Sequence, residues 1–269
     1  MANRINEKFN QLKAANCGGF IPFIVAGDPN LQTTKGLIIE LARVGASLIE
    51  LGVPFSDPVA DGVTIQAASE RALLNPVSVE AILNVVAQAR SEKCSVPIIL
   101  FSYFNPILQF GLNNFAEKAF ESGVDGILVT DLVPEEAGEF QAILAAKDLA
   151  LIMLAAPTSS DERLQKICSR ASGFVYAVSR AGVTGARTAL SSDAESLVGR
   201  LRNFTDLPIA VGFGISNASQ VQDTWKYADA AVVGSAIVAE IARLSKIMDE
   251  NSEEFIEKVG EFAENLLPK

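Results

Sequence analysis

The amino-acid sequence predicts a single (β/α)8 barrel, a TIM barrel, with an extra helix at its N-terminus. Short apolar runs alternate with longer segments of helical periodicity, and the runs are continuous, as in parallel strands buried on both faces. Eight strand-then-helix units follow one another without a linker or a change of composition. The 269 residues also lie close to the roughly 250 typical of this fold. We therefore expect residues 1–269 to form one domain.

The predicted elements follow from this alternation in chain order. Ile5, Phe9 and Leu12 have helical spacing, so the N-terminus is expected to be part of the fold and not a targeting signal. The strands are expected at 20–26, 47–53, 97–103, 126–131, 149–155, 173–179, 208–214 and 229–234. The helices are expected at 33–44, 78–90, 114–122, 134–147, 161–171, 194–204, 218–226, 235–244 and 252–266. Pro134 and Asp161 are first-turn start signals. An open, doubly wound sheet is the alternative that this pattern leaves.

Composition excludes several classes of partner. The net charge is −10, and no stripe of Lys and Arg is present, so nucleic acids and anionic membranes are not expected to bind. The apolar runs are far shorter than the ~18 residues of a membrane span. These features predict a soluble protein.

The chain contains no histidine, the usual acid–base group near neutral pH and the commonest metal ligand. Ser-His-Asp and Cys-His chemistry are thereby excluded, and no metal site is predicted. Cys17, Cys94 and Cys168 lack CxxC spacing and are expected to be reduced core residues in a cytosol-like compartment. Proton transfer must therefore depend on other groups, and a carboxyl group would need a raised pKa to act as an acid.

Candidate catalytic groups are carboxylates at the carboxyl ends of strands, where the active site of this fold lies. Glu50 interrupts an apolar strand near its end, so it must be paired, protonated or chemically active. Asp57 and Asp61 follow in a long loop, where aspartates more often cap turns. Asp28 and Asp131 also stand at strand ends, and we expect them to bond loop backbone.

Glycines suggest a phosphate site after the last two strands. Gly212-Phe-Gly-Ile-Ser216 follows the seventh strand, and Gly234-Ser-Ala236 opens the helix after the eighth. Glycines let backbone N–H groups approach an anion, and a helix N-terminus adds partial positive charge. The segment 179–188 after the sixth strand is small, flexible and partly basic, as in a mobile lid, although a plain surface loop has the same composition.

Four segments together resemble the tryptophan synthase alpha chain family. They are 22–29, 49–62, 179–185 and 212–216, and Pro-Phe-Ser-Asp-Pro-x-Ala-Asp-Gly at 54–62 is the most specific. The resemblance implies retro-aldol cleavage of indole-3-glycerol phosphate to indole and glyceraldehyde 3-phosphate, a step of tryptophan biosynthesis. It implies no cofactor in this chain. It also implies a partner beta chain that carries pyridoxal phosphate, in an alpha2-beta2 tetramer that contacts the loop 54–61 and the lid.

The resemblance also implies roles for individual residues. Glu50 becomes the general acid/base, and Asp61 holds the indole N–H. The phosphate site is expected to comprise Gly185, Gly212, Gly214, Gly234 and Ser235, and the indole pocket Phe23, Phe101, Leu128, Tyr176 and Phe213. Thr184 in the lid is expected to hydrogen-bond a catalytic carboxylate when the lid closes.

Two positions depart from the family pattern. Val63 stands where many members carry Pro, and Phe101 stands where a smaller aliphatic residue is expected to face the indole. Three alternatives remain: an epimerase or isomerase of sugar phosphates, a catalytically silent subunit that activates a beta chain, and a stand-alone indole-releasing lyase. The compartment is expected to be the cytoplasm, or the plastid stroma.

Overall fold

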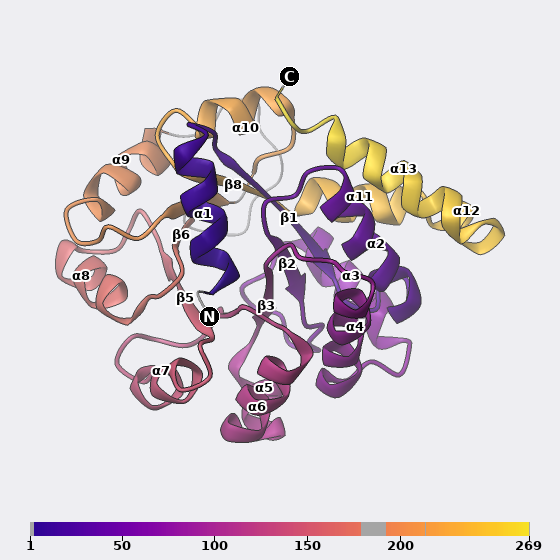
Figure 1. The fold of residues 1–269 in the computed structure, drawn as a ribbon, viewed down its shortest axis with the longest axis horizontal. Helices are drawn as coiled ribbons and strands as arrows, with labels where there is room; N and C mark the ends of the chain where they lie inside the picture. Colours follow the sequence, from indigo (N-terminus) through magenta and orange to yellow (C-terminus); the bar gives the residue numbers. More distant parts are fainter. Residues whose placement is uncertain (1–2, 179–191, 213, 269) are drawn as a thin grey trace.

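The structure is a computed structural model that describes residues 3–178, 192–212 and 214–268. Eight parallel strands form a closed barrel in the order of the sequence, so the open sheet is excluded (Figure 1). The strands are β1 Gly19–Val25, β2 Ile49–Gly52, β3 Ile98–Ser102, β4 Gly126–Val129, β5 Ala150–Ala155, β6 Val175–Val178, β7 Ile209–Gly212 and β8 Ala230–Val233. Seven of the eight are shorter than predicted, by one to three residues.

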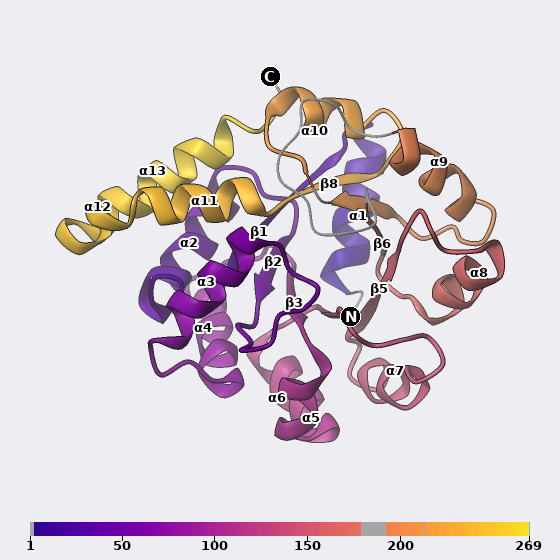
Figure 2. The same ribbon diagram turned by 180° about the vertical axis from the view of Figure 1, so that it is seen from behind.

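Helices surround the barrel (Figures 1 and 2). They are α1 Arg4–Ala14, α2 Leu31–Arg43, α3 Val63–Leu73, α4 Val79–Ser91, α5 Phe104–Phe110, α6 Leu112–Ser122, α7 Gly138–Ala145, α8 Asp161–Arg170, α9 Ser192–Leu201, α10 Ala218–Thr224, α11 Ser235–Arg243, α12 Ser245–Glu250 and α13 Ser252–Glu264. Of these described helices, none is both long and apolar enough to cross a membrane.

The helices differ from the prediction in three places. The helix expected from Pro134 begins at Gly138, because residues 134–137 form a turn first. Both α3 and α5 lie where no helix was predicted, and the start of α3 was expected to be part of a long loop. Cys17 is exposed and therefore not a core residue, whereas Cys94 and Cys168 are buried as expected.

The N-terminal helix α1 closes the end of the barrel at which the strands begin (Figure 1). Ile5 is fully buried, and the ring of Phe9 packs against Phe174 with centroids 5.7 Å apart. The buried Asp125 anchors the same end, since its carboxylate accepts hydrogen bonds from Arg4 (2.7 Å) and Arg90 (2.8 Å). The carboxyl ends of the strands therefore remain as the open end, seen from the front in Figure 2.

Two apolar layers form the core. The larger lies between the strands and the outer helices, and the smaller fills the barrel interior. Strand register places Phe23 beside Glu50, and Phe101 beside both Gly52 and Leu128. The interior layer thus brings one carboxyl group among aromatic side chains.

Candidate active site

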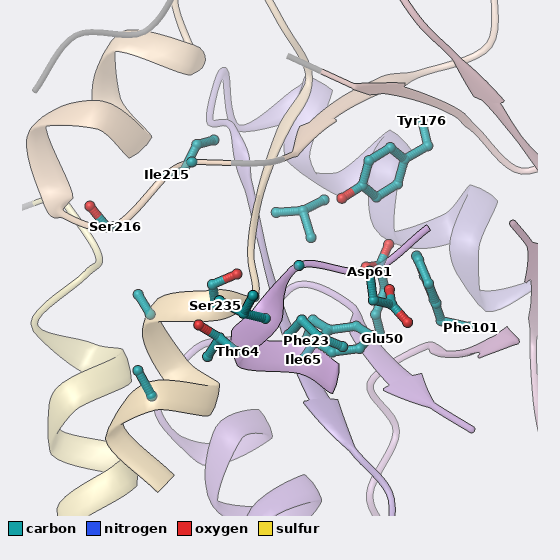
Figure 3. A pocket seen from close by; sticks show the side chains of 17 residues that line it. Phe23, Glu50, Asp61, Thr64, Ile65, Phe101, Tyr176, Ile215, Ser216 and Ser235 are labelled. Atoms are coloured by element: carbon teal, nitrogen blue, oxygen red, sulfur yellow. The ribbon is translucent and has the colours of Figure 1, made fainter. Parts of the chain in front are cut away.

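A cavity of about 280 Å³ lies at the carboxyl end of the barrel (Figure 3). Its lining comes from β1, β2, β3, β6, β8 and the loops and helices that follow several strands. The described lining residues are Phe23, Glu50, Asp61, Gly62, Val63, Thr64, Ile65, Phe101, Tyr176, Gly214, Ile215, Ser216, Val232, Gly234, Ser235, Ala236 and Ala239. Sequence analysis predicted eight of them: Phe23, Glu50, Asp61, Phe101, Tyr176, Gly214, Gly234 and Ser235.

Glu50 is a buried carboxyl group on β2. It is 1% exposed, and its Oε1 has no hydrogen-bond partner among the described residues. Burial raises the pKa of Glu50 to about 8, because the apolar surroundings disfavour the charged form. At neutral pH most of the folded molecules therefore carry a protonated Glu50 that faces the cavity.

Asp61 lies in the loop between β2 and α3 and has a different environment. Its Oδ2 accepts a hydrogen bond from the Tyr103 hydroxyl at 3.1 Å. Burial raises the pKa of Asp61 to about 6, and the Tyr103 hydrogen bond opposes that shift. Asp61 is thus mostly ionised at neutral pH, so the cavity holds one acid and one carboxylate. Figure 3 labels both side chains.

Aromatic rings form the apolar wall near these carboxyl groups. Phe23 and Phe101 pack edge to face, with centroids 5.2 Å apart. Tyr176 lies above Glu50 in Figure 3, and burial, followed by the charge of Glu50, raises the pKa of Tyr176 well above its ordinary value. Aromatic rings beside a few polar groups are typical of a site for a flat aromatic ligand.

The part of the cavity at the N-terminus of α11 is suited to an anion. Gly234 is the N-cap of α11 and provides no side-chain cap, so the first N–H groups of this helix are not capped by that residue. Ser235 adds a hydroxyl, and Gly214 has a φ of +83°, which favours glycine. Lys and Arg are missing from the described lining, so backbone dipoles and hydroxyls would bind the anion there.

Two predicted site residues are not part of the described lining. Leu128 is fully buried in the barrel interior. Gly212 has a steric role, because a Cβ at this position would lie 1.9 Å from the Tyr176 hydroxyl oxygen. Thr184, Gly185, Phe213 and the predicted lid at 179–188 lie outside the described residues.

The other strand-end aspartates have structural partners. Asp131 accepts a hydrogen bond from the backbone N–H of Phe104 at 2.7 Å, as expected of a loop aspartate. Asp28 differs from the expectation, because its carboxylate accepts two hydrogen bonds from the Arg71 guanidinium, at 2.9 and 2.7 Å. This pair fixes α3 to the end of β1.

The first turn of α3 is one part of the site that sequence reasoning missed, and Val232 on β8 and Ala239 on α11 are others. Thr64 and Ile65 line the cavity, and Val63 is the first residue of the helix and 79% exposed. The preceding Gly- and Pro-containing stretch suggests a loop, although Ile65, Ala68 and Ala72 have helical spacing that could have identified α3. Val63, where many family members carry Pro, is therefore the first residue of a helix. Pro is favoured at that position but is not required.

Comparisons with known proteins agree with this geometry. A model of the tryptophan synthase alpha chain family matches residues 9–267. The tryptophan synthase alpha chain of Caulobacter sp. (strain K31) is 46% identical over 261 residues, which are 97% of this chain and 95% of the relative. That of Geotalea daltonii is 48% identical over 242 residues, 90% of this chain and 91% of the relative.

Solved structures give the same result. Tryptophan synthase subunit alpha from Legionella pneumophila superposes with a TM-score of 0.88 at 33% identity, covering 99% of this chain and 97% of that one. A Pyrococcus furiosus chain, from the tryptophan synthase α2β2 complex, has a TM-score of 0.83 at 41% identity, covering 93% and 97%. The chain therefore belongs to the tryptophan synthase alpha chain family, whose members cleave indole-3-glycerol phosphate.

Proposed function

We propose that this cavity carries out the retro-aldol cleavage of indole-3-glycerol phosphate to indole and glyceraldehyde 3-phosphate, with Glu50 as the group that transfers the proton. The observation that carries the proposal is the buried Glu50 carboxyl group, whose pKa of about 8 keeps it protonated beside the ionised Asp61. A general acid is most effective when its pKa lies near the working pH.

The proton balance of the reaction needs only one such group. Glu50 donates its proton to C3 of the indole, which prepares the bond between C3 and the glycerol chain for cleavage. As that bond breaks, its electron pair returns to the indole ring. The Glu50 carboxylate then accepts the proton of the adjacent glycerol hydroxyl, which becomes the aldehyde of glyceraldehyde 3-phosphate. Glu50 is protonated again at the end, and neither water nor a redox partner is consumed.

Asp61 stabilises the charge that develops in this reaction. Protonation at C3 places positive charge on the ring nitrogen, and an ionised carboxylate beside its N–H lowers the energy of that state. The Tyr103 hydroxyl occupies Oδ2 of Asp61, which leaves Oδ1 to accept the indole N–H. The rings of Phe23 and Phe101 hold the indole in place, and Phe101 makes this wall bulkier than an aliphatic residue would.

The substrate phosphate binds at the opposite side of the cavity, at the N-terminus of α11. Figure 3 places Ser235 away from the Glu50 and Asp61 pair, which suits a substrate with an indole at one end and a phosphate at the other. Gly214, Gly234 and Ser235 are part of the described lining there. Gly185 and Gly212 remain sequence-based candidates for the same phosphate, and Thr184 and Phe213 for the lid and the indole pocket.

A beta chain that carries pyridoxal phosphate is the proposed partner, in an alpha2-beta2 tetramer in the cytoplasm or plastid stroma. The Pyrococcus furiosus relative comes from an α2β2 complex in which the subunits activate each other. In this chain Val59 is 82% exposed in the loop 54–61, at the cavity end of the barrel, which suits an apolar contact there. The alpha chain itself is expected to need no cofactor, because Glu50 supplies the proton transfers and Asp61 stabilises the charge.

The test is indole release from indole-3-glycerol phosphate by the purified chain, with and without a beta chain. We expect release by the chain alone and faster release with the partner. Release that the partner leaves unchanged would indicate a stand-alone lyase. No release in either case, with the beta chain still activated, would indicate a silent subunit and contradict the proposal.

A further inference from the structure

Tyr103 holds the loop between β2 and α3 at three points. It directly follows β3 and is 3% exposed. Its ring packs against Phe55 with centroids 5.1 Å apart. Its hydroxyl oxygen accepts a hydrogen bond from the backbone N–H of Ala60 at 2.9 Å and lies 3.1 Å from Oδ2 of Asp61. A residue of the third βα unit thus anchors the loop of the second.

The Ala60 contact fixes the direction of the bond to Asp61. A backbone N–H can only donate, so the Tyr103 oxygen accepts from Ala60. Its single proton is left for the Asp61 carboxylate or for the side chain of Thr130, which also hydrogen-bonds this hydroxyl, and the charged carboxylate is the stronger acceptor. A hydrogen bond donated to a carboxylate is stronger than one donated to a neutral carboxyl group. The geometry therefore favours the ionised form of Asp61 over the protonated form.

The other groups that face Asp61 do not provide this stabilisation. Glu50 from β2 and Tyr176 from β6 share the cavity, and neither carries a positive charge. The described lining contains no Lys or Arg. Gln66 on α3 bonds the backbone oxygen of Asp61 and not its carboxylate. Burial raises the pKa of Asp61, and the hydrogen bond from Tyr103 is what lowers it.

We propose that Tyr103 is a positioning residue of the reaction, which orients the Asp61 carboxylate and stabilises its ionised form by donating a hydrogen bond. This inference rests on the proposed role of Asp61. It gives Tyr103 a function beyond packing, because the loop 54–61 and the charge of Asp61 depend on the same hydroxyl. Any partner contact that moves this loop would also change the acidity of Asp61.

The test is the pH dependence of kcat/KM for indole release, measured with Tyr103→Phe. This variant keeps the ring packing on Phe55 and removes only the hydroxyl. We expect the midpoint of the acidic limb to move up by about one pH unit, since loss of a hydrogen bond to a charged group has about that effect. Activity should recover toward the wild-type value as the pH rises.

Two controls separate the hydrogen bond from packing. Phe55→Leu weakens the ring contact but leaves the hydroxyl, so its midpoint should match the wild type. Tyr227→Phe removes a hydroxyl from a tyrosine that follows α10 and is not in the cavity lining, and it should also leave the midpoint unchanged. Thermal unfolding of each variant establishes that it is folded.

The outcomes are distinguishable. A Tyr103→Phe midpoint equal to that of the wild type, with only a lower plateau, would reduce Tyr103 to a packing residue. Equal shifts in Tyr103→Phe and Phe55→Leu would assign the effect to loop position and overturn the proposal as well. If the wild type has no acidic limb, or Asp61→Asn retains it, the role of Asp61 in the proposed function fails instead.

Discussion

Replacement of Glu50 by glutamine is expected to have opposite effects on activity and on stability. Glutamine has nearly the same shape but neither donates a proton to C3 nor accepts one from a hydroxyl. Indole release should fall at least ~10²-fold, the lower end of the range for general acid–base catalysis, with substrate binding largely kept. The same change should stabilise the folded protein increasingly as the pH rises.

The stability effect follows from the raised pKa of Glu50. Below pH 4.5 both the folded and the unfolded chain hold the proton, and Glu50 contributes no pH dependence. Between pH 4.5 and about 8 the unfolded chain releases the proton while the folded chain keeps it, so the free energy of unfolding falls. Each pH unit in this window lowers the free energy of unfolding by about 1.4 kcal/mol. From pH 5 to pH 8 the total is about 3.5 kcal/mol, because protonation is partial near each pKa.

The assay is urea unfolding of the wild type and of Glu50→Gln at pH 5 and pH 8. Any constant cost of burying the amide cancels when the two pH values are compared. The stability of the variant minus that of the wild type should therefore rise by about 3.5 kcal/mol between pH 5 and pH 8. Glu261→Gln on α13 is the matched control, because the Glu261 side chain is exposed.

Two results would refute this reasoning. If the stability difference stays the same at pH 5 and pH 8, Glu50 is ionised in the folded protein and is not the proposed acid. If Glu50→Gln releases indole at a near-normal rate, another group transfers the proton. The two measurements are independent, since the first needs no substrate.

Two further substitutions test the glycines. Gly212→Ala would place a Cβ 1.9 Å from the Tyr176 hydroxyl oxygen, and this overpacking should destabilise the protein by about 1–3 kcal/mol in urea unfolding. Gly199→Ala, in open space on α9, should instead be neutral or slightly stabilising, and equal costs would contradict the steric role of Gly212. Gly234→Asp would place a negative charge against the substrate phosphate and should raise KM about tenfold or more, a cost of ~1.4 kcal/mol. Gly234→Ala has ordinary contacts with Phe23, the nearest at 3.6 Å, and should change KM much less; similar values would place the phosphate elsewhere.

The strand order and the main catalytic candidate could be predicted because they depend on local pattern. Continuous apolar runs indicate buried parallel strands, and eight such units favour closure into a barrel, which the strand pairing confirms. Glu50 is identifiable because a carboxylate inside an apolar strand must have a reason to be buried. In the structure, burial raises the pKa of Glu50, so that it can act as an acid near neutral pH.

The remaining features depend on contacts between distant parts of the chain. Tyr103 and Asp61 are 42 positions apart, and only the neighbouring positions of β2 and β3 in the barrel bring them together. Gly212 ends an apolar run, as a phosphate-binding glycine would. In the structure, however, the ring of Tyr176 on the adjacent strand β6 fills the space that a side chain at position 212 would need. The start of α3 was missed because Gly and Pro residues before it conceal the helical spacing.

The most direct test of the central claim is the pH profile of kcat/KM for indole release by the wild-type chain. The reaction is proposed to need Asp61 ionised and Glu50 protonated, and kcat/KM reports the pKa values of the free protein. The rate should rise with pH through about 6, as Asp61 loses its proton, and fall above about 8, as Glu50 loses its own. A profile that is flat from pH 5 to pH 9, or that continues to rise above pH 8, would contradict the claim that Glu50 acts as the acid and Asp61 as the ionised carboxylate.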